Sequence, residues 1–238
     1  MADPRQQFQG ALDALDTVFA PLSAQTLTVD GCTYCYTQAD LDVLAGPADR
    51  VPEDLIPLVA AEVTDHWGDF PDVYRRMTPR IVRSLAEGKL HVDHGLIAAR
   101  LNESGWRDWA PTEREALEKT WETWWRATLY AYPAADEVWD VLEALCVSTG
   151  TLAPWLDVWT GTRTGAADAH LRDAAEWWLI ESELSDLHFG FYGEFYATPW
   201  LLPWLAGPVH DRLDAGQRAR VEDIKSWPES QACRHSSR

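Results

Sequence analysis

The chain has 238 residues, of which 46% are hydrophobic and 24% are charged, a composition that is ordinary for a folded protein and excludes global disorder. Its 38 acidic and 20 basic residues give a formal net charge of -18, which argues against nucleic acid as a partner because a surface of this sign repels phosphates. Fourteen tryptophans predict an unusually aromatic core.

The amino-terminal segment over residues 1–19 has no basic stretch followed by an apolar run, so we expect no signal peptide. No apolar stretch approaches the roughly 18 residues that a membrane-spanning helix needs. We therefore predict a cytoplasmic protein with no membrane partner. In a reducing compartment the four cysteines favour free thiols or metal ligands over structural disulfides.

Apolar residues recur with the period of a helix along almost the whole chain, and the alternation typical of strands is nearly absent. The first helix is predicted over residues 7–22. Thr37 is followed three residues later by Asp40, which predicts a capping box that opens a short helix ending near Leu44. Another helix is expected over residues 53–67, with Gly68 as its stop.

The segment over residues 71–88 predicts a helix with one apolar face, formed by Val73, Met77, Ile81 and Leu85. The same helix carries the densest basic cluster of the chain, namely Arg75, Arg76, Arg80 and Arg83. We expect these arginines to pair within their own helix, with Asp72 and Glu87.

Further helices are predicted over residues 94–106, 112–133, 135–149, 166–189 and 208–225. The clearest is 112–133, where tryptophans at helical spacing indicate a core helix. Because short Pro/Gly loops join these segments, neighbours should be antiparallel. We predict an all-α fold, in which a single all-helical domain over residues 1–225 forms an irregular antiparallel bundle or a short helical-repeat-like array. A flexible tail should follow over residues 226–238.

Cys32 and Cys35 are separated by two residues, a spacing that lets one turn supply two ligands to zinc. A second such pair is missing from the sequence. His91 and His94 lie close enough in sequence to complete a site, so the candidate metal ligands are Cys32, Cys35, His91 and His94. His66 and Cys146 are the other possible completions.

Two other interpretations of the cysteine pair remain open. The pair precedes a helix, whose dipole lowers a thiol's pKa and favours redox chemistry, although the βαβ context of a thioredoxin-like motif is absent. Alternatively, both cysteines are small buried thiols in a tight turn, flanked by Tyr34 and Tyr36 that pack on the core.

Asp65, His66 and Asp69 place an imidazole between two carboxylates, which makes them weak candidates for acid or base catalysis. A structural interpretation is favoured, in which the helix ends at Gly68 with His66 near its last carbonyls and Asp69 capping the next helix.

Aromatic residues cluster repeatedly, and adjacent pairs such as Trp177 and Trp178 cannot both point inward from one helix. Some rings must therefore lie on the surface and mark a binding region. The predicted partner-binding residues are aromatic residues between positions 189 and 204: Phe189, Phe191, Tyr192, Phe195, Tyr196, Trp200 and Trp204.

The Cys32/Cys35 pair, Trp67-Gly68-Asp69, Pro79-Arg80-Ile81 and the run from Trp106 to Arg114 together give the chain a family likeness. It resembles an uncharacterised family of bacterial all-helical proteins with an N-terminal CxxC, a WGD turn and a PRI helix. The resemblance implies an all-helical fold and no known activity. Thr33 and Tyr34 stand where the family pattern has a histidine, so no metal role is carried over.

From these features we predict a cytoplasmic binding or adaptor protein that recognises a protein or peptide through an aromatic and acidic surface; the net charge permits a basic partner. No cofactor is expected in this case. The alternative is a metal- or thiol-dependent enzyme, with zinc as the metal, built on the cysteine pair and the histidines His66, His91 and His94. A second alternative is an acidic inhibitor that mimics nucleic acid. No GxGxxG, Walker A, HExxH or GxSxG motif is present in the sequence.

Overall fold

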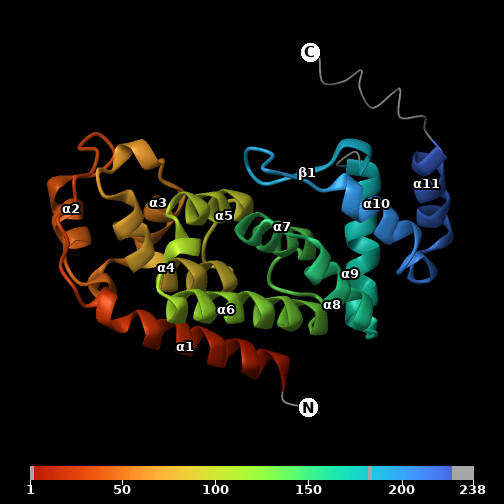
Figure 1. Cartoon of the computed structure of the whole chain (residues 1–238), viewed down its shortest axis with the longest axis horizontal. Coiled ribbons are helices and arrows are strands. Elements are labelled where there is room, and N and C mark those ends of the chain that lie inside the picture. Colours follow the sequence, from red (N-terminus) through yellow and green to blue (C-terminus); the bar gives the residue numbers. More distant parts are fainter. Residues whose placement is uncertain (1–2, 182–183, 227–238) are drawn as a thin grey trace. The chain divides into compact units, whose positions relative to one another are not determined.

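The computed structural model describes residues 3–181 and 184–226, so the predicted tail lies, from residue 227 onward, outside the described residues. Helices make up nearly all regular structure, which confirms the all-α prediction (Figure 1). Among the residues that the structure describes, the one sheet is an antiparallel hairpin of β1 (His188–Phe189) and β2 (Phe195–Tyr196). None of the helices seen in residues 3–181 and 184–226 has the length and apolar character of a membrane span.

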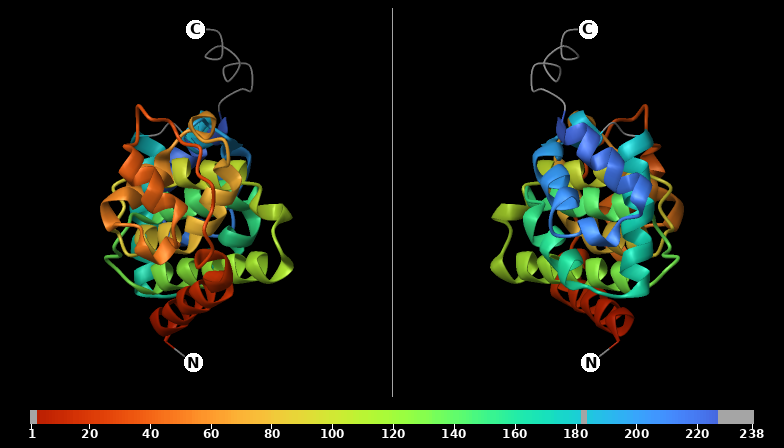
Figure 2. Two further views of the ribbon diagram at one scale, coloured as in Figure 1. Left: turned by 90° about the vertical axis from the view of Figure 1, so that its left-hand side faces the viewer. Right: turned by 90° about the vertical axis from the view of Figure 1, so that its right-hand side faces the viewer.

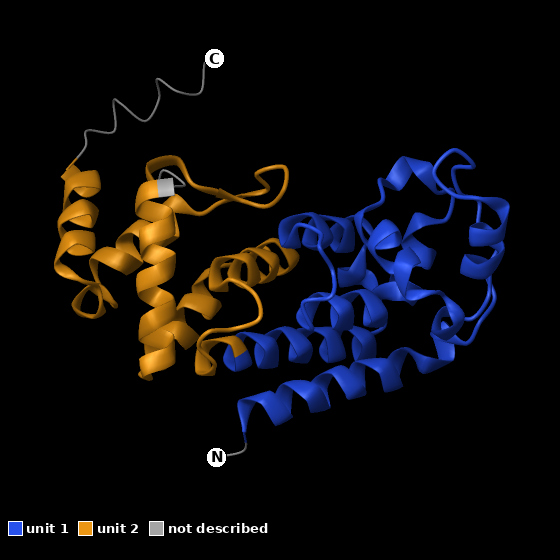
Figure 3. Ribbon diagram, turned by 180° about the vertical axis from the view of Figure 1, so that it is seen from behind, with its two compact units in different colours: residues 1–127 blue, residues 128–238 orange. Residues whose placement is uncertain are grey.

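The chain divides into two compact units, residues 1–127 and 128–238 (Figure 3). The boundary falls inside one helix, α6 (Pro111–Tyr130), so no loop or linker separates the two units in the sequence. Compact packing does not establish independent folding. The single domain over residues 1–225 therefore stays a prediction.

Unit 1 is built around helix α4 (Phe70–Ala86), against which α1 (Pro4–Ser23), α3 (Ile56–Ala61) and α5 (His94–Glu103) pack (Figures 1 and 2). Unit 1 also contains the short helix α2 (Gln38–Ala45), which is joined to α3 by two 3-10 turns, Ala48–Arg50 and Glu53–Leu55. The predicted apolar face of α4 is buried, as shown by Val73, Met77, Ile81 and Leu85.

Arg76 lies on the same helix but is fully buried. Its guanidinium donates to the carbonyl oxygens of Gln25 and Gly46 at 3.1 and 2.7 Å, and also to that of Leu44. Gln25 precedes the segment with the cysteine pair, and Leu44 and Gly46 lie at the end of α2, so one buried cation fixes both ends of this part of the chain to α4. Burial lowers the pKa of Arg76 from its ordinary value.

The prediction that the α4 arginines pair within their helix is largely wrong. Arg75 forms a bidentate pair with Glu113 of α6 at 2.7–3.0 Å. Arg80 binds Glu53 at 2.5 Å, and Arg83 binds Asp16 of α1 at 2.6 Å, with only a 3.8 Å approach to Glu87 of its own helix. Neighbouring elements offer shorter contacts than the helix itself.

Unit 2 contains α7 (Val138–Thr149), α8 (Ala153–Gly161), α9 (Gly165–Glu176), the hairpin, α10 (Thr198–Ala206) and α11 (Ala215–Ser226). Its core centres on Trp159, whose ring lies 6.3 Å from that of Trp178 and 5.3 Å from that of Trp204. Helix α11 packs on α10 (Figure 2). The prediction of one helix over residues 166–189 is wrong at its carboxyl end. Helix α9 ends at Glu176, a π-helical turn begins at Trp177, and His188 and Phe189 form β1.

Candidate metal centre

Two segments of unit 1 meet at the cysteine pair: residues 31–36, here called the Cys loop, and residues 62–67, here called the His turn. Gly31 and Trp67 form an isolated antiparallel bridge. On one side of it the amide of Cys32 donates to the carbonyl oxygen of His66 at 2.8 Å, and on the other the amide of Gly68 donates to that of Asp30 at 2.8 Å. The main chain therefore holds the two segments in register.

The Cys loop is a tight turn, in which the amides of Cys35 and Tyr36 both donate to the carbonyl oxygen of Cys32, at 3.1 and 3.0 Å. It leads directly into α2, whose predicted capping box between Thr37 and Asp40 is confirmed. Tyr36 is buried and packs edge to face on Trp67, with ring centroids 4.9 Å apart. The expectation that Tyr34 also packs on the core is wrong, because its side chain is 97% exposed.

The side chains of Cys32, Cys35 and His66 converge at this junction, each offering a ligand atom within 4.8 Å of the others. The Sγ of Cys35 lies 3.5 Å from the Nδ1 of His66. In a tetrahedral zinc site with a Zn–S bond of about 2.3 Å and a Zn–N bond of about 2.0–2.1 Å, sulfur and nitrogen ligands lie about 3.6 Å apart. The observed spacing thus matches one edge of such a site.

The electrostatics of the two thiols differ. Backbone amides of Tyr34 and Cys35 point at the Sγ of Cys32 and lower its pKa. Burial of the thiol, followed by the proximity of Cys32 and of the Glu62 carboxylate, raises the pKa of Cys35. Amides that donate to a sulfur stabilise its thiolate, which is the form that binds metal.

The idea that both cysteines merely fill space does not fit their surroundings. Cys32 is half-buried and Cys35 is exposed, whereas Cys146 is fully buried within α7 of unit 2. Burial raises the pKa of Cys146 well above that of a free thiol. The Cys loop therefore carries the accessible sulfur chemistry of the described residues.

The histidine at the cysteine pair is His66, and the described residues do not bring His91 or His94 into the cluster. His91 is exposed, and the ring of His94 stacks on Trp124 at 6.1 Å. His66 was among the possible completions, but its sequence distance from the pair gave no reason to prefer it. The bridge between Gly31 and Trp67 brings it there.

The predicted acid-base group of Asp65, His66 and Asp69 does not form around the imidazole. The carboxylate that contacts His66 is Glu62, whose Oε1 lies 2.9 Å from Nδ1. Asp65 is exposed, and Asp69 precedes α4 without a side-chain capping bond. Sequence reasoning missed Glu62, which the spacing of four residues to His66 could have indicated.

The arrangement differs from a nucleophile-base-carboxylate relay. In such a relay the imidazole uses one ring nitrogen for the nucleophile and the other for the carboxylate. Here Cys35 and Glu62 approach the same atom, Nδ1 of His66. The geometry is therefore not that of a relay, and the side chains that converge as metal ligands do are Cys32, Cys35 and His66, without Glu62.

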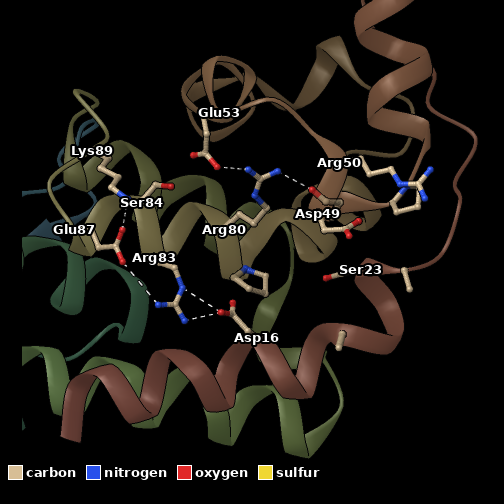
Figure 4. Close-up of a pocket in the computed structure, with 15 residues that line it drawn as sticks. Asp16, Ser23, Asp49, Arg50, Glu53, Arg80, Arg83, Ser84, Glu87 and Lys89 are labelled. Carbon is tan, nitrogen blue, oxygen red and sulfur yellow. Dashed lines mark hydrogen bonds and ion pairs between the residues drawn. The ribbon is translucent and has the colours of Figure 1, made fainter. Parts of the chain in front are cut away.

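A cavity of about 730 Å³ in the same unit is lined by residues of α1, α4 and the segment 47–53 (Figure 4). Four basic and four acidic side chains line it. Arg83 contacts Asp16 and Glu87, and Lys89 binds Glu87 at 2.6 Å. Because these charges largely pair with one another, the cavity gives no argument for a charged ligand.

The predicted partner-binding residues divide by exposure. Phe191, Tyr192, Tyr196 and Trp200 are exposed, whereas Phe189 and Trp204 are buried and Phe195 is half-buried. Phe189 and Trp204 contribute to the unit 2 core, so they cannot offer their rings to a partner. As the sequence required, Trp178 is buried while Trp177 is exposed.

Comparison with known proteins adds no relative: no protein-family model, curated protein or solved structure matches this chain. The resemblance to a family of bacterial helical proteins therefore stays a prediction.

Proposed function

We propose that this chain is a zinc-binding protein, with Cys32, Cys35 and His66 as ligands. The observation that supports this most is the convergence of the three ligand atoms within 4.8 Å. Two thiolates and an imidazole are ligands that zinc prefers. Amides directed at Cys32 add the support that thiolate ligands receive in metal sites.

In this proposal the ion joins the Cys loop to the His turn. It sits beside the bridge between Gly31 and Trp67, and so reinforces with coordinate bonds a junction that the main chain already makes. The proposal also places the protein in the cytoplasm, where reducing conditions keep the cysteines available as ligands.

The proposal is tested by measuring zinc in the full chain purified without chelators and by titrating the apo form with Zn²⁺. We expect about one zinc per chain, as a single cluster requires. Cys32→Ser, Cys35→Ser and His66→Asn should each abolish tight binding. His91→Asn and Cys146→Ser are matched controls and should retain it. A folded wild-type chain that binds no Zn²⁺, or equal loss in the controls, would contradict the proposal.

A second candidate function, recognition of a basic peptide, is supported by the exposed rings of the unit 2 hairpin. Phe191 and Tyr192 lie in its turn with ring centroids 4.9 Å apart, and Tyr196 and Trp200 follow in the chain. The acidic residues Asp186 and Glu194 belong to the same region. Aromatic faces beside carboxylates favour Arg and Lys side chains.

A labelled arginine-containing peptide and its glutamate-substituted counterpart separate this function from nonspecific adhesion. Fluorescence anisotropy should show binding of the basic peptide only. Phe191→Ala and Trp200→Ala should each weaken it about fivefold, the scale of one cation–π contact. Tyr34→Ala removes an exposed ring from unit 1 and should leave binding unchanged. Equal binding by all variants would exclude the hairpin surface.

A further inference from the structure

We propose that Cys32 and Cys35 form a reversible oxidation site, in which hydrogen peroxide joins the two sulfurs in a disulfide and so releases the zinc. This inference rests on the proposed zinc-binding function. Cys35 is exposed and Cys32 is half-buried, so an oxidant reaches the pair from solvent. Exposure beside a second thiol is typical of cysteines that respond to oxidants.

The Cys loop holds the two sulfurs close enough for a bond to form between them. Their Sγ atoms lie within 4.8 Å of each other. The amide of Cys35 donates to the carbonyl oxygen of Cys32 at 3.1 Å, which closes a turn whose first and last Cα atoms lie within about 7 Å. Bridged cysteines have Cα atoms about 4.4–6.8 Å apart, so rotation of the two side chains can form the bond while the turn is kept.

The turn is held by the main chain and not by the ion. The amide of Tyr36 also donates to the carbonyl oxygen of Cys32, at 3.0 Å, and the bridge between Gly31 and Trp67 anchors the turn to the His turn. These backbone contacts do not involve the ligand side chains. The two sulfurs therefore stay together when zinc leaves, so the disulfide can be reduced and the ion can bind again.

The reaction balances with hydrogen peroxide as the oxidant. Because zinc binds cysteine as the thiolate, access decides which sulfur reacts first, and Cys35 is the more exposed. Its sulfur attacks one peroxide oxygen, the O–O bond breaks, and Cys35 becomes a sulfenic acid as hydroxide leaves. The Cys32 thiolate then attacks the Cys35 sulfur, the S–O bond breaks, and a second hydroxide leaves. The two sulfurs thus lose two electrons, and the peroxide gains them.

Zinc release follows because the sulfurs of a disulfide are no longer thiolates, the form that binds metal. Of the three proposed ligands only His66 would remain. Cys146 does not replace either sulfur, because it is fully buried within α7. Oxidation would therefore remove the coordinate bonds between the Cys loop and the His turn.

The test uses the full chain with Cys146→Ser and Cys233→Ser, which leaves the Cys loop as the only source of thiols. Zinc-loaded protein is treated with a small excess of hydrogen peroxide, and released zinc is measured with a colorimetric indicator. We expect loss of the bound ion, about one per chain, and a mass about 2 Da lower in the peptide that carries both cysteines. Dithiothreitol should restore the mass and, with added Zn²⁺, the binding. Untreated protein controls for spontaneous release.

His66→Asn in the same background separates the oxidation from the metal. This variant should not hold zinc tightly, yet it should form the same disulfide because it keeps both sulfurs and the Cys loop. A His66→Asn chain that forms no disulfide would contradict the claim that the turn itself places the pair.

The outcomes distinguish the two proposals. A starting chain that binds no zinc overturns the zinc-binding function, whatever the peroxide does. If the chain binds zinc and peroxide leaves the ion in place, zinc binding stands and the oxidation site is wrong. Zinc release with a gain of oxygen on either sulfur, not reversed by dithiothreitol, would also contradict a reversible disulfide.

Discussion

The backbone amide of Cys32 donates a hydrogen bond to the carbonyl oxygen of His66 over 2.8 Å, so the main chain joins two candidate ligands before their side chains meet. The candidate centre is therefore built on a junction that hydrogen bonds and packing already form. The Tyr36 and Trp67 rings support it from the core side. This arrangement sets expectations for what metal, substitution and chemical modification should do.

Removal of zinc should lower stability without unfolding the protein, because the bridge and α2 cap do not depend on the ion. Binding of a ligand at 100 times its dissociation constant stabilises the folded state by about 2.7 kcal/mol. We expect chelation to lower the thermal midpoint while the far-ultraviolet circular dichroism at room temperature keeps its helical shape. Complete loss of helix on chelation would show that the ion, rather than the main chain, builds the junction.

Gly31→Ala should disturb the Cys loop. A Cβ at this position would lie 2.5 Å from the Cδ2 of Leu41 in α2, so the loop or the leucine must move. Forced contacts of this kind cost about 1–3 kcal/mol. Urea unfolding should show this loss, and zinc affinity should fall with it. Gly10→Ala is the control, because a Cβ there meets nothing within 4 Å and a helical alanine is favoured.

Arg76→Met should destabilise unit 1 by about 3 kcal/mol, because it leaves buried carbonyl oxygens without their charged donor. The methionine keeps much of the side-chain volume, so the loss reports on hydrogen bonding. Arg83→Met, on the same helix, removes partly exposed ion pairs and should cost less than about 1 kcal/mol. Urea unfolding midpoints of the two variants give the comparison. Equal losses of stability would mean that the buried hydrogen bonds of Arg76 stabilise the fold no more than the exposed ion pairs of Arg83 do.

Thiol modification should separate the cysteines by position. In the folded apo protein, iodoacetamide should label Cys32 and Cys35, while Cys146 reacts only after denaturation because it is fully buried and burial raises its pKa. Added Zn²⁺ should slow labelling of the Cys loop alone. Peptide mass spectrometry reads each site separately. Rapid labelling of Cys146 in the native chain would contradict the packing of α7.

Adjacent tryptophans provide a matched test of the unit 2 core. Trp178 is buried against Trp159 and Phe189, so Trp178→Ala should cost about 3–5 kcal/mol. Trp177 is exposed and stacks on Trp139, and its loss should cost about 1 kcal/mol. Chemical denaturation measures the loss of stability in both variants. A larger loss for Trp177→Ala than for Trp178→Ala would contradict the burial of Trp178 in the unit 2 core.

Features set by local sequence were predictable. The capping box of Thr37 and Asp40 and the apolar face of α4 depend on residues a few positions apart, and both are confirmed. The boundary between the units could not be predicted, because it lies within a continuous helix, α6. The hairpin after α9 was missed since its strands are only two residues long and give no alternating pattern.

At the candidate site, too, features set by neighbouring residues were predictable and contacts between distant residues were not. The cysteine spacing marked the Cys loop, but the choice among the histidines required the bridge of Gly31 to Trp67, a contact across many residues. His91 and His94 were favoured for being close to each other, which says nothing about their distance from the cysteines. The arginines of α4 were misjudged for the same reason, since their partners lie on other elements.

X-ray absorption at the zinc edge of the metal-loaded full chain tests the central claim most directly. The account predicts two sulfur ligands at about 2.3 Å and two nitrogen or oxygen ligands at about 2.0–2.1 Å. Cys35→Ser, which should lose tight binding, should retain no zinc after the same loading and removal of free metal. A shell made only of nitrogen and oxygen, or a protein that carries no zinc after incubation with the ion, would contradict a centre at Cys32, Cys35 and His66.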